Sequence, residues 1–151
     1  MWPNYPPGSE PAKCPVFVHN EIHIAAPPDA VWKKLVRPRQ WPEWFPGAKN
    51  VDAPDADLAK GTKVAWNMLG ARIRVQIEAC EPGRVLEWRG GAAGVDAYHG
   101  WLLEPAGNGT RVVTDETEKG PLPWVLRWYL RGALHRAHQE WLECLARASA
   151  G

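Results

Sequence analysis

Three polar residues interrupt apolar rows in the C-terminal half of the sequence. His99 shares one side of the segment "VDAYHGWLL" with Trp101 and Leu103, and Thr114 and Glu116 share one side of "RVVTDETE". A histidine and a carboxylate that meet in an apolar pocket can exchange protons with a bound molecule, and their pKa values shift there. His99 and Glu116 are therefore the catalytic candidates in this sequence, and Thr114 completes the polar group.

The sequence leaves structural alternatives open for these residues. A register shift of one position would turn His99 outward and Tyr98 inward, because neighbouring residues of a strand face opposite sides. His99 can also be a buried residue whose nitrogens are satisfied by hydrogen bonds. Glu116 can equally lie in solvent at the edge of the sheet.

The other histidines do not predict a metal site. His19 and His23 share one face of a strand, but four residues separate them by about 13 Å, which is too far to share an ion. His135 and His138 have helical i, i+3 spacing, but no Asp or Cys stands where it would complete a ligand set. No Walker loop, nucleophile elbow or dinucleotide fingerprint occurs, so we expect neither a metal nor a cofactor.

Charges are balanced along the chain, with 18 Lys and Arg against 17 Asp and Glu among 151 residues. This balance, without any basic run, disfavours nucleic acid and anionic membranes as partners. Arg72 and Arg74 alternate with Ile73 and Val75, which predicts that the two arginines face solvent. If the strand is reversed, they place two cations in the interior, which would suit a ligand with a carboxylate.

The cysteines and the N-terminus predict a cytoplasmic protein. Cys14, Cys80 and Cys144 are far apart and odd in number, which is typical of free thiols in a reducing compartment. The first residues lack the apolar segment of a signal peptide, and nowhere do 18 apolar residues run together, so we expect no membrane span.

The pattern of elements predicts an α+β domain. Residues 1–15 are rich in Pro and Gly and are expected to be an extended or disordered leader, followed by a single domain over residues 16–151. Alternating apolar residues predict a strand over 16–24, a brief strand over 49–52 and then a run of strands joined by short turns, including a hairpin at Asn108-Gly109, so the sheet should be antiparallel. Helical spacing predicts a short helix after Pro28, one turn within "QWPEWFP", and a long amphipathic helix from about Pro123 to Ala148. That helix spans about 37 Å, enough to cross a curved sheet and leave a hollow beneath it.

Several segments in this order resemble one family. They are "IHIAAPPDAVWKKL", "WPEWFP", "ACEPGRVLEW", "YHGWLLEPAGNGTRVV" and "ETEKGPLPWVL". Together they resemble the polyketide cyclase/dehydrase family of the START-like (SRPBCC) superfamily, from about Val16 to the C-terminus. The resemblance implies a helix-grip fold, in which a seven-stranded curved antiparallel sheet wraps around the C-terminal helix and an apolar pocket, with two short helices after the first strand.

The residues that should face inward from these strands and from the long helix predict the lining of the pocket. The predicted ligand-binding residues on strands are Trp66, Met68, Trp88, His99, Trp101, Thr114 and Glu116, and those on the long helix are Leu126, Tyr129 and Leu130. The sequence has ten tryptophans, which is more than one core usually needs. In the segment from Ala25 to Pro46 we expect Trp32 to anchor the first helix in the core. Trp41, Trp44 and Phe45 are expected to form an aromatic rim at the mouth of the cavity, and the two tryptophans complete the twelve predicted ligand-binding residues.

Three functions fit this pattern. The first is the binding of a small hydrophobic or aromatic molecule in the cavity, by a monomer or homodimer without a nucleic-acid partner or integral membrane association. The alternative is an enzyme of the polyketide cyclase, dehydratase or aromatase type, which would use His99 and Glu116. An interaction protein that docks through exposed tryptophans is the third. Family resemblance does not choose among them, because relatives include lipid carriers, hormone receptors and aromatase/cyclases.

Overall fold

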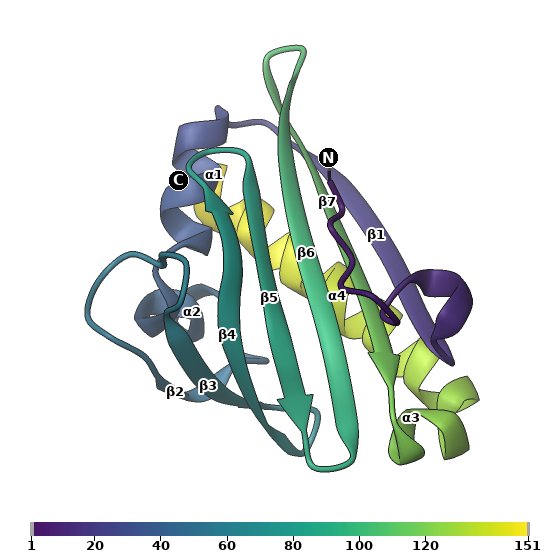
Figure 1. Ribbon diagram of the computed structural model, residues 1–151. Helices are drawn as coiled ribbons and strands as arrows, with labels where there is room; N and C mark the ends of the chain where they lie inside the picture. The colour runs from purple at the N-terminus through teal and green to yellow at the C-terminus, as the bar shows by residue number, and fades with distance from the viewer. Residues whose placement is uncertain (1, 151) are drawn as a thin grey trace.

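The computed structural model describes residues 2–150, and a seven-stranded antiparallel sheet dominates it in the order β1-β7-β6-β5-β4-β3-β2. The strands are β1 (Val16–Ile24), β2 (Lys49–Asp52), β3 (Lys63–Met68), β4 (Ala71–Glu81), β5 (Val85–Ala92), β6 (Val95–Ala106) and β7 (Gly109–Lys119). The predicted α+β fold, with a curved antiparallel sheet around a C-terminal helix, is confirmed (Figure 1).

Two of the α-helices and both 3₁₀ turns begin at prolines, whose fixed φ suits a first helical turn. The helices are α1 (Pro28–Leu35), α2 (Trp41–Trp44), α3 (Pro121–Val125) and α4 (Arg127–Ala150), with 3₁₀ turns η1 (Pro11–Lys13) and η2 (Pro38–Gln40). The single C-terminal helix predicted from Pro123 is wrong at its start, since Leu126 leaves helical geometry with φ −102° and ψ 18° and separates α3 from α4. None of the helices in the described chain is long and apolar enough to cross a membrane.

The register between β6 and β7 decides which residues face the interior. His99 lies directly opposite Glu116, and Trp101 lies opposite Thr114. The two strands are joined by Gly107 and Asn108 rather than by the predicted Asn108-Gly109 pair, and Gly107 supplies the positive φ of 59° that the turn needs. Gly109 already belongs to β7. His99 faces inward and Tyr98 outward, so the predicted phase of β6 is confirmed.

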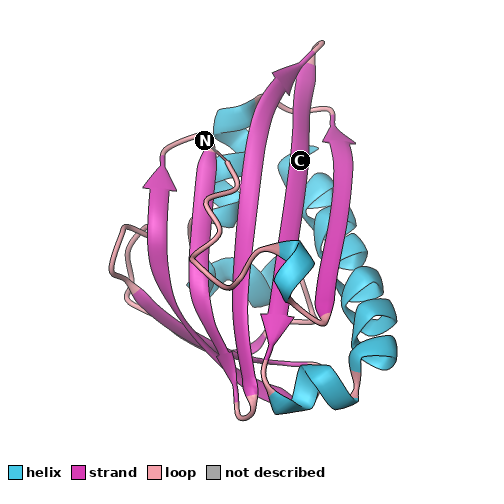
Figure 2. Cartoon of the chain, turned by 45° about the vertical axis from the view of Figure 1, so that its right-hand side comes forward, coloured by secondary structure: helices cyan, strands magenta, loops and turns pink. Residues whose placement is uncertain are grey.

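A cluster of five tryptophans fills the space between the sheet and α4. Its neighbouring ring centroids lie 5.2 to 6.2 Å apart. The cluster comprises Trp41 from α2, Trp66 from β3, Trp88 from β5, Trp101 from β6 and Trp141 from α4. Half of the chain's ten tryptophans are therefore core residues. Figure 2 shows α4 lying along one face of the sheet.

The N-terminal segment covers the opposite, outer face of the sheet, in front of β6 and β7 in Figure 1. Trp2 packs against an outward-facing apolar cluster on β5, β6 and β7. The ring centroid of Tyr5 lies 5.1 Å from that of Tyr98, and the backbone N and Nδ2 of Asn4 donate to the buried Glu87 carboxylate at 3.1 and 3.3 Å. The central strands are thus covered on both faces, as an extended apolar sheet requires.

Candidate functional site

A cavity of about 520 Å³ lies between the concave face of the sheet and the segment formed by α3 and the first half of α4. Most of its lining is apolar. Eight of the twelve predicted ligand-binding residues line it: Trp66, Met68, Trp88, His99, Glu116, Leu126, Tyr129 and Leu130. Trp101 and Thr114 lie behind this layer, where Trp101 packs in the tryptophan cluster and Thr114 contacts His99.

Three buried residues from different elements meet at the wall of this cavity. Nδ1 of His99 lies 3.2 Å from Oε1 of Glu116, and Nε2 of His138 lies 3.5 Å from the same oxygen. The two imidazole rings are stacked, with centroids 4.6 Å apart and an interplanar angle of 20°. On its other side, Nε2 of His99 lies 2.5 Å from Oγ1 of Thr114. One carboxylate oxygen thus contacts two stacked imidazoles in an otherwise apolar interior.

The elements explain how the cluster forms. Cross-strand pairing places His99 beside Glu116, and α4 crosses above them with His138 on its buried side. Sequence reasoning considered His138 only together with His135, which is exposed on α4. The better signal was the spacing of His138 from Leu134 and Trp141, four and three residues away, which places it on the apolar stripe of the helix.

Burial and proximity shift the acid–base properties of the cluster. Burial, reinforced by the nearby His138, lowers the pKa of His99 to about 4. Burial alone would raise the pKa of Glu116, but hydrogen bonds with His138 and His99 hold that pKa well below its usual range. Burial and the Glu116 charge raise the pKa of Glu118, the next inward-facing residue of β7. Near neutral pH, Glu116 is therefore the ionised carboxylate of the pair.

The predicted aromatic rim does not form the mouth of the cavity. Trp41 is 0% exposed and donates its indole N–H to the Leu35 carbonyl at 3.0 Å, while Phe45 stacks on Trp141 with centroids 4.8 Å apart. Trp44 is half-buried against the core. None of the three lines the cavity. The predicted helical turn is present as α2, but its aromatic residues pack into the core and not at the cavity mouth. Trp32 packs against the core as expected.

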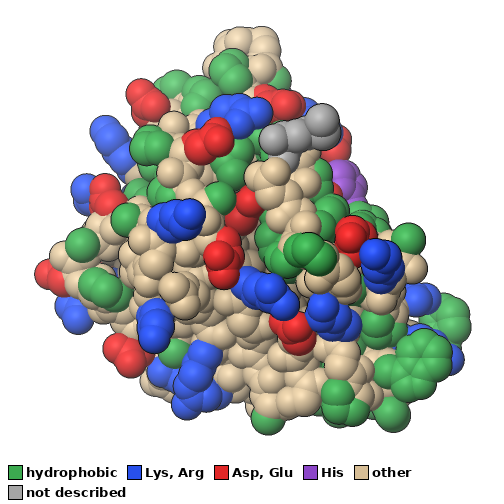
Figure 3. All heavy atoms as spheres, viewed as in Figure 1, with side chains coloured by type: hydrophobic (Ala, Val, Ile, Leu, Met, Phe, Trp, Pro, Cys, Tyr) green, Lys and Arg blue, Asp and Glu red, His purple; other side chains and the backbone are tan. Residues whose placement is uncertain are grey.

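The cavity instead opens beside α3 and the start of α4. Leu122, Leu126 and Tyr129 line the cavity and are also exposed. Beside them Trp124 and Trp128 are 61% and 71% exposed. Figure 3 shows hydrophobic side chains gathered over this end of the molecule, at the lower right.

Arginines accompany these exposed tryptophans. The guanidinium carbon of Arg127 lies 4.5 Å from the Trp124 ring centroid, and that of Arg131 lies 4.6 Å from the Trp128 ring centroid. Both distances are within the range of a cation–π contact. The exposed aromatic surface is therefore bordered by fixed positive charge.

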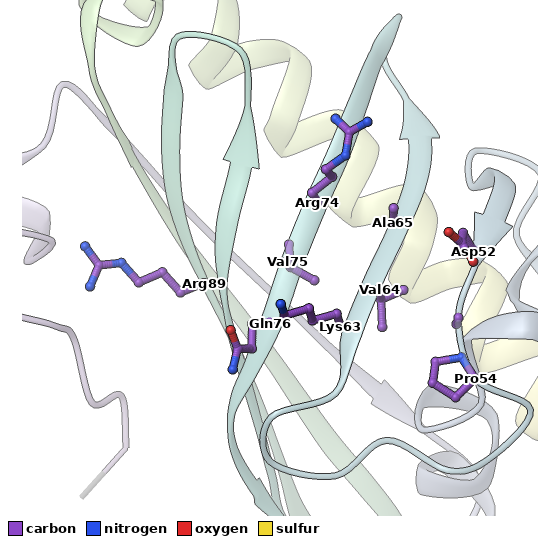
Figure 4. Close-up of a pocket in the computed structure, with 10 residues that line it drawn as sticks. Asp52, Pro54, Lys63, Val64, Ala65, Arg74, Val75, Gln76 and Arg89 are labelled. Atoms are coloured by element: carbon purple, nitrogen blue, oxygen red, sulfur yellow. The ribbon is translucent and has the colours of Figure 1, made fainter.

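A second hollow, of about 670 Å³, lies over β3, β4 and β5 beside β2 (Figure 4). Lys63, Arg74, Gln76 and Arg89 spread over it, and Arg89 pairs with Asp96 at 3.5 Å. Its charged side chains are exposed or half-exposed, so water already satisfies them. The residues that line this hollow do not include a buried cluster of acidic and basic side chains, which a catalytic site usually contains.

The positions of Arg72 and Arg74 agree only in part with the solvent-facing prediction. Arg74 is exposed, and Arg72 reaches sideways to donate to the Asn50 carbonyl at 2.6 Å and to Oδ1 of Asn67 at 3.0 Å. Both residues contribute to the lining of the cavity, but neither forms an ion pair with its buried carboxylates. The interior charge is therefore set by the Glu116 cluster.

Comparisons with known proteins agree with this architecture. The structure is similar to that of the hypothetical protein jhp0584 from Helicobacter pylori, with 23% identity, a TM-score of 0.87 and coverage of 97% of this chain and 95% of the other. It is also similar to the Zhui aromatase/cyclase from Streptomyces sp. R1128, with 18% identity, a TM-score of 0.76 and coverage of 89% and 93%. DynU16, a protein of the dynemicin biosynthetic locus, matches with 22% identity and a TM-score of 0.69 over 87% of this chain but 46% of its own.

These likenesses show the fold, and the sequence itself shows the family. A search of the curated proteins gives no significant match. A family model described as polyketide cyclase / dehydrase and lipid transport matches residues 16–150. The match covers every strand and helix from β1 through α4. The chain therefore belongs to the polyketide cyclase/dehydrase and lipid transport family.

Proposed function

We propose that the protein binds a small hydrophobic or aromatic molecule that carries one polar group. The apolar part of the molecule occupies the cavity between the sheet and α4, and its polar group meets the cluster of His138, Glu116 and Glu118. The observation that supports this function is a cavity of about 520 Å³ whose apolar lining is interrupted by buried polar atoms. Ligand pockets typically measure 300 to 1,000 Å³ and have this composition.

Two unpaired atoms support a ligand with a polar group. Nδ1 of His138 and Oε1 of Glu118 are buried without a hydrogen-bond partner among the described residues, and both residues line the cavity. A buried polar atom without a partner costs about 1–3 kcal/mol. A hydroxyl or amide group of a ligand that hydrogen-bonds to these atoms would recover part of that cost, so the site favours such a molecule over a plain hydrocarbon.

A cavity-blocking variant tests this proposal. Ala97 of β6 lines the cavity, whereas Ala106 lies at the other end of the same strand outside it. We expect the fluorescent probe 8-anilinonaphthalene-1-sulfonate to bind the wild-type protein and the Ala106→Phe control alike. Binding should weaken at least about tenfold in Ala97→Phe, because the added ring occupies the space of the probe. Equal binding by all three proteins would contradict the cavity as the site.

Native mass spectrometry identifies the physiological ligand. Protein purified from its own host should carry a molecule that is absent from the Ala97→Phe variant. The mass of this molecule would name the ligand class. A host-purified protein that is free of bound molecules and also fails to bind the probe would overturn the proposal.

A polyketide cyclase or dehydratase activity in the same cavity is the second candidate. It is favoured by the contacts of His99 and His138 with the Glu116 carboxylate, which provide a proton acceptor and donors at the cavity wall, and by the structural similarity to an aromatase/cyclase. Positioned acid–base groups contribute about 10²- to 10⁴-fold to a rate. In an assay with a linear aromatic-polyketide precursor, His99→Gln and Glu116→Gln should each slow product formation by at least about 100-fold. Unchanged rates in both variants would exclude these residues from catalysis.

A further inference from the structure

We propose that His99, Glu116 and His138 bind a divalent transition-metal ion, of the Zn²⁺ or Fe²⁺ kind, at the inner wall of the cavity. This site goes beyond the proposed binding of an organic molecule and does not depend on it. It also departs from the expectation of no metal that followed from the sequence, where His138 had no acidic partner at a helical spacing. The fold supplies that partner from β7.

The separations of the three side chains suit a shared ion. Each residue offers one ligand atom, and these atoms all lie within 4.8 Å of one another. With metal–ligand bonds of about 2.0–2.1 Å, two ligand atoms of a tetrahedral site lie about 3.3 Å apart. The Nδ1–Oε1 separation of 3.2 Å at His99 and the Nε2–Oε1 separation of 3.5 Å at His138 already match this value. Only the gap between the two imidazole nitrogens has to narrow, by at most about 1.5 Å.

The donor set selects the kind of metal. Two imidazoles and one carboxylate are the protein ligands of many catalytic zinc sites and of ferrous sites that keep open positions. Calcium and magnesium prefer sites made of oxygen ligands alone. Because all three ligands line one wall of the cavity, the remaining coordination positions face the space in which a molecule can bind.

A contact with Thr114 orients one of the two histidines, His99, as metal sites require. Metal-binding histidines usually hold their second nitrogen in a hydrogen bond, which fixes the ring and leaves the first nitrogen to the ion. Oγ1 of Thr114 lies 2.5 Å from Nε2 of His99, while Nδ1 of the same ring points at the Glu116 carboxylate. When Nε2–H donates to Thr114, Nδ1 is left as a lone pair that can bind an ion shared with Glu116.

Two further polar atoms beside these ligands lack partners, and water at the site could serve them. Nδ1 of His138 and Oε1 of Glu118 are both buried and unpaired among residues 2–150. Glu118 follows Glu116 on the same face of β7, and both line the cavity. A metal-bound water that projects into the cavity could donate a hydrogen bond to Oε1 of Glu118, as ordered water does for buried polar groups.

Metal titration of the chelator-treated full-length protein tests the site. We expect one Zn²⁺ per chain by isothermal titration calorimetry, one Fe²⁺ per chain under anaerobic conditions, and a visible absorption band of low-coordinate Co²⁺. Co²⁺ should also quench tryptophan fluorescence, because the Trp88 and Trp101 ring centroids lie 4.9 and 5.1 Å from that of His99. Comparison of the Zn²⁺ and Fe²⁺ affinities then identifies the favoured ion.

Two ligand variants and a matched histidine control locate the bound ion. His138→Gln and Glu116→Gln keep the approximate shape of each side chain and should weaken binding at least about 100-fold. His135→Gln changes an exposed histidine on the same helix and should bind as the wild type does. Circular dichroism and thermal unfolding establish that each variant is folded, and His99→Gln serves in place of any variant that is not.

The proposal is overturned if the wild-type protein binds none of the three ions. It is equally overturned if His138→Gln and Glu116→Gln bind as tightly as the wild type, or if His135→Gln alone loses binding, which would mark a surface site. Binding of the fluorescent probe distinguishes a failure of the metal site from a failure of the proposed binding of a hydrophobic molecule. Probe binding by metal-free protein would leave the cavity function standing when the metal site fails, and its absence would count against the cavity instead.

Discussion

Trp41 links the two short helices that follow β1 to the centre of the molecule. Its ring contacts those of Trp66, Trp88 and Trp141 with centroids 5.2 to 5.8 Å apart, and its indole N–H is satisfied by the Leu35 carbonyl. Trp44, three residues later, is only half-buried. The two residues therefore make different contributions to stability despite their similar sequence surroundings.

Replacement of Trp41 should destabilise the fold strongly. We expect Trp41→Ala to lower the free energy of unfolding by about 3–5 kcal/mol, because a large cavity opens in the core. Trp44→Ala should cost on the order of 1 kcal/mol, since part of its ring is already in water. Urea unfolding followed by circular dichroism measures both values, and a cost for Trp44→Ala as large as for Trp41→Ala would contradict this assignment.

His19 should make stability depend on pH through contacts on the outer face. Its Nδ1 lies 2.5 Å from Oδ1 of Asp115 and its Nε2 lies 3.1 Å from Oε2 of Glu21, which in turn accepts from Arg111 at 2.7 Å. Burial alone would lower the pKa of His19, but the hydrogen bonds to Asp115 and Glu21 outweigh it and raise the pKa above its usual value near 6.5. A raised pKa in the folded state means that protonated His19 stabilises the fold.

This stabilisation is complete below pH 6.5, the unfolded value, and is lost as pH rises through the higher folded value. The melting temperature of the wild type should therefore exceed that of His19→Gln by more at pH 5.5 than at pH 8.5. His23→Gln is the control, because His23 is exposed on the same strand face and contacts a backbone carbonyl only. A wild-type advantage that grows toward pH 8.5 would reverse the expected sign.

At the residue level, the sequence predicted the inward row of β6 and β7 but only part of the polar cluster. His99, Thr114 and Glu116 could be found because a strand alternates with period two, so a polar residue in an apolar row is conspicuous. His138 was missed because its partner comes from β7, more than twenty residues earlier in the chain, and no local spacing records that contact. Trp41 was misplaced because a single helical turn does not reveal which of its sides faces the core, and the contacts of Trp41 come from β3, β5 and α4.

At the level of elements, the N-terminal segment acts as an extra layer on the sheet. Trp2 and Tyr5 cover outward-facing side chains of β5, β6 and β7, and Oγ1 of Thr117 donates to the Ser9 carbonyl at 2.7 Å. Composition alone could not reveal this, since Pro and Gly in residues 1–15 indicate only the lack of regular structure. The signal lay in the aromatic residues of the leader and in buried outward positions such as Tyr98.

Removal of residues 1–9 should destabilise the domain without closing its cavity. We expect the free energy of unfolding to fall by about 2–4 kcal/mol, because apolar surface on the outer face returns to water. The double variant Trp2→Ala/Tyr5→Ala should reproduce most of this loss, whereas Lys13→Ala, at an exposed position, should not. The cavity lies on the opposite face, so probe binding at low temperature should survive the deletion. Unchanged stability on urea unfolding would show that the segment does not cover the sheet.

The break between α3 and α4 is a second feature of the elements that the sequence did not predict. Helical periodicity predicted one continuous helix, and Leu126, Leu130 and Leu134 do follow it. The spacing of apolar residues along the sequence does not record contacts with distant strands. In the structure, α3 packs against β6 and β7 beside the cavity. The break places Leu122 and Leu126 at the cavity and leaves Trp124 and Trp128 exposed beside its opening. A tertiary contact therefore determines where the long helix begins.

For the whole molecule, the concave face of the sheet, α3 and α4 together enclose a space that packing alone does not fill. Close-packed interiors rarely leave voids larger than a water molecule, so a cavity of about 520 Å³ lowers the stability of the free protein. The tryptophan cluster forms the close-packed part of the interior, and the cavity lies at the end of the interior near α3. Rigid aromatic packing beside an open cavity allows the lining to keep its shape when the cavity is empty.

Occupation of this cavity should stabilise the entire domain, because a ligand that binds only the folded state shifts the unfolding equilibrium. At a free concentration 100 times its dissociation constant, the ligand adds about 2.7 kcal/mol. For a chain of this size that corresponds to a rise of roughly 5–10 °C in melting temperature. Differential scanning fluorimetry of the wild type and Ala106→Phe with increasing ligand should show this rise, while Ala97→Phe should not. A rise of the same size in Ala97→Phe would mean that the ligand binds outside the cavity. The unfilled space between α4 and the sheet would then not be explained by ligand binding.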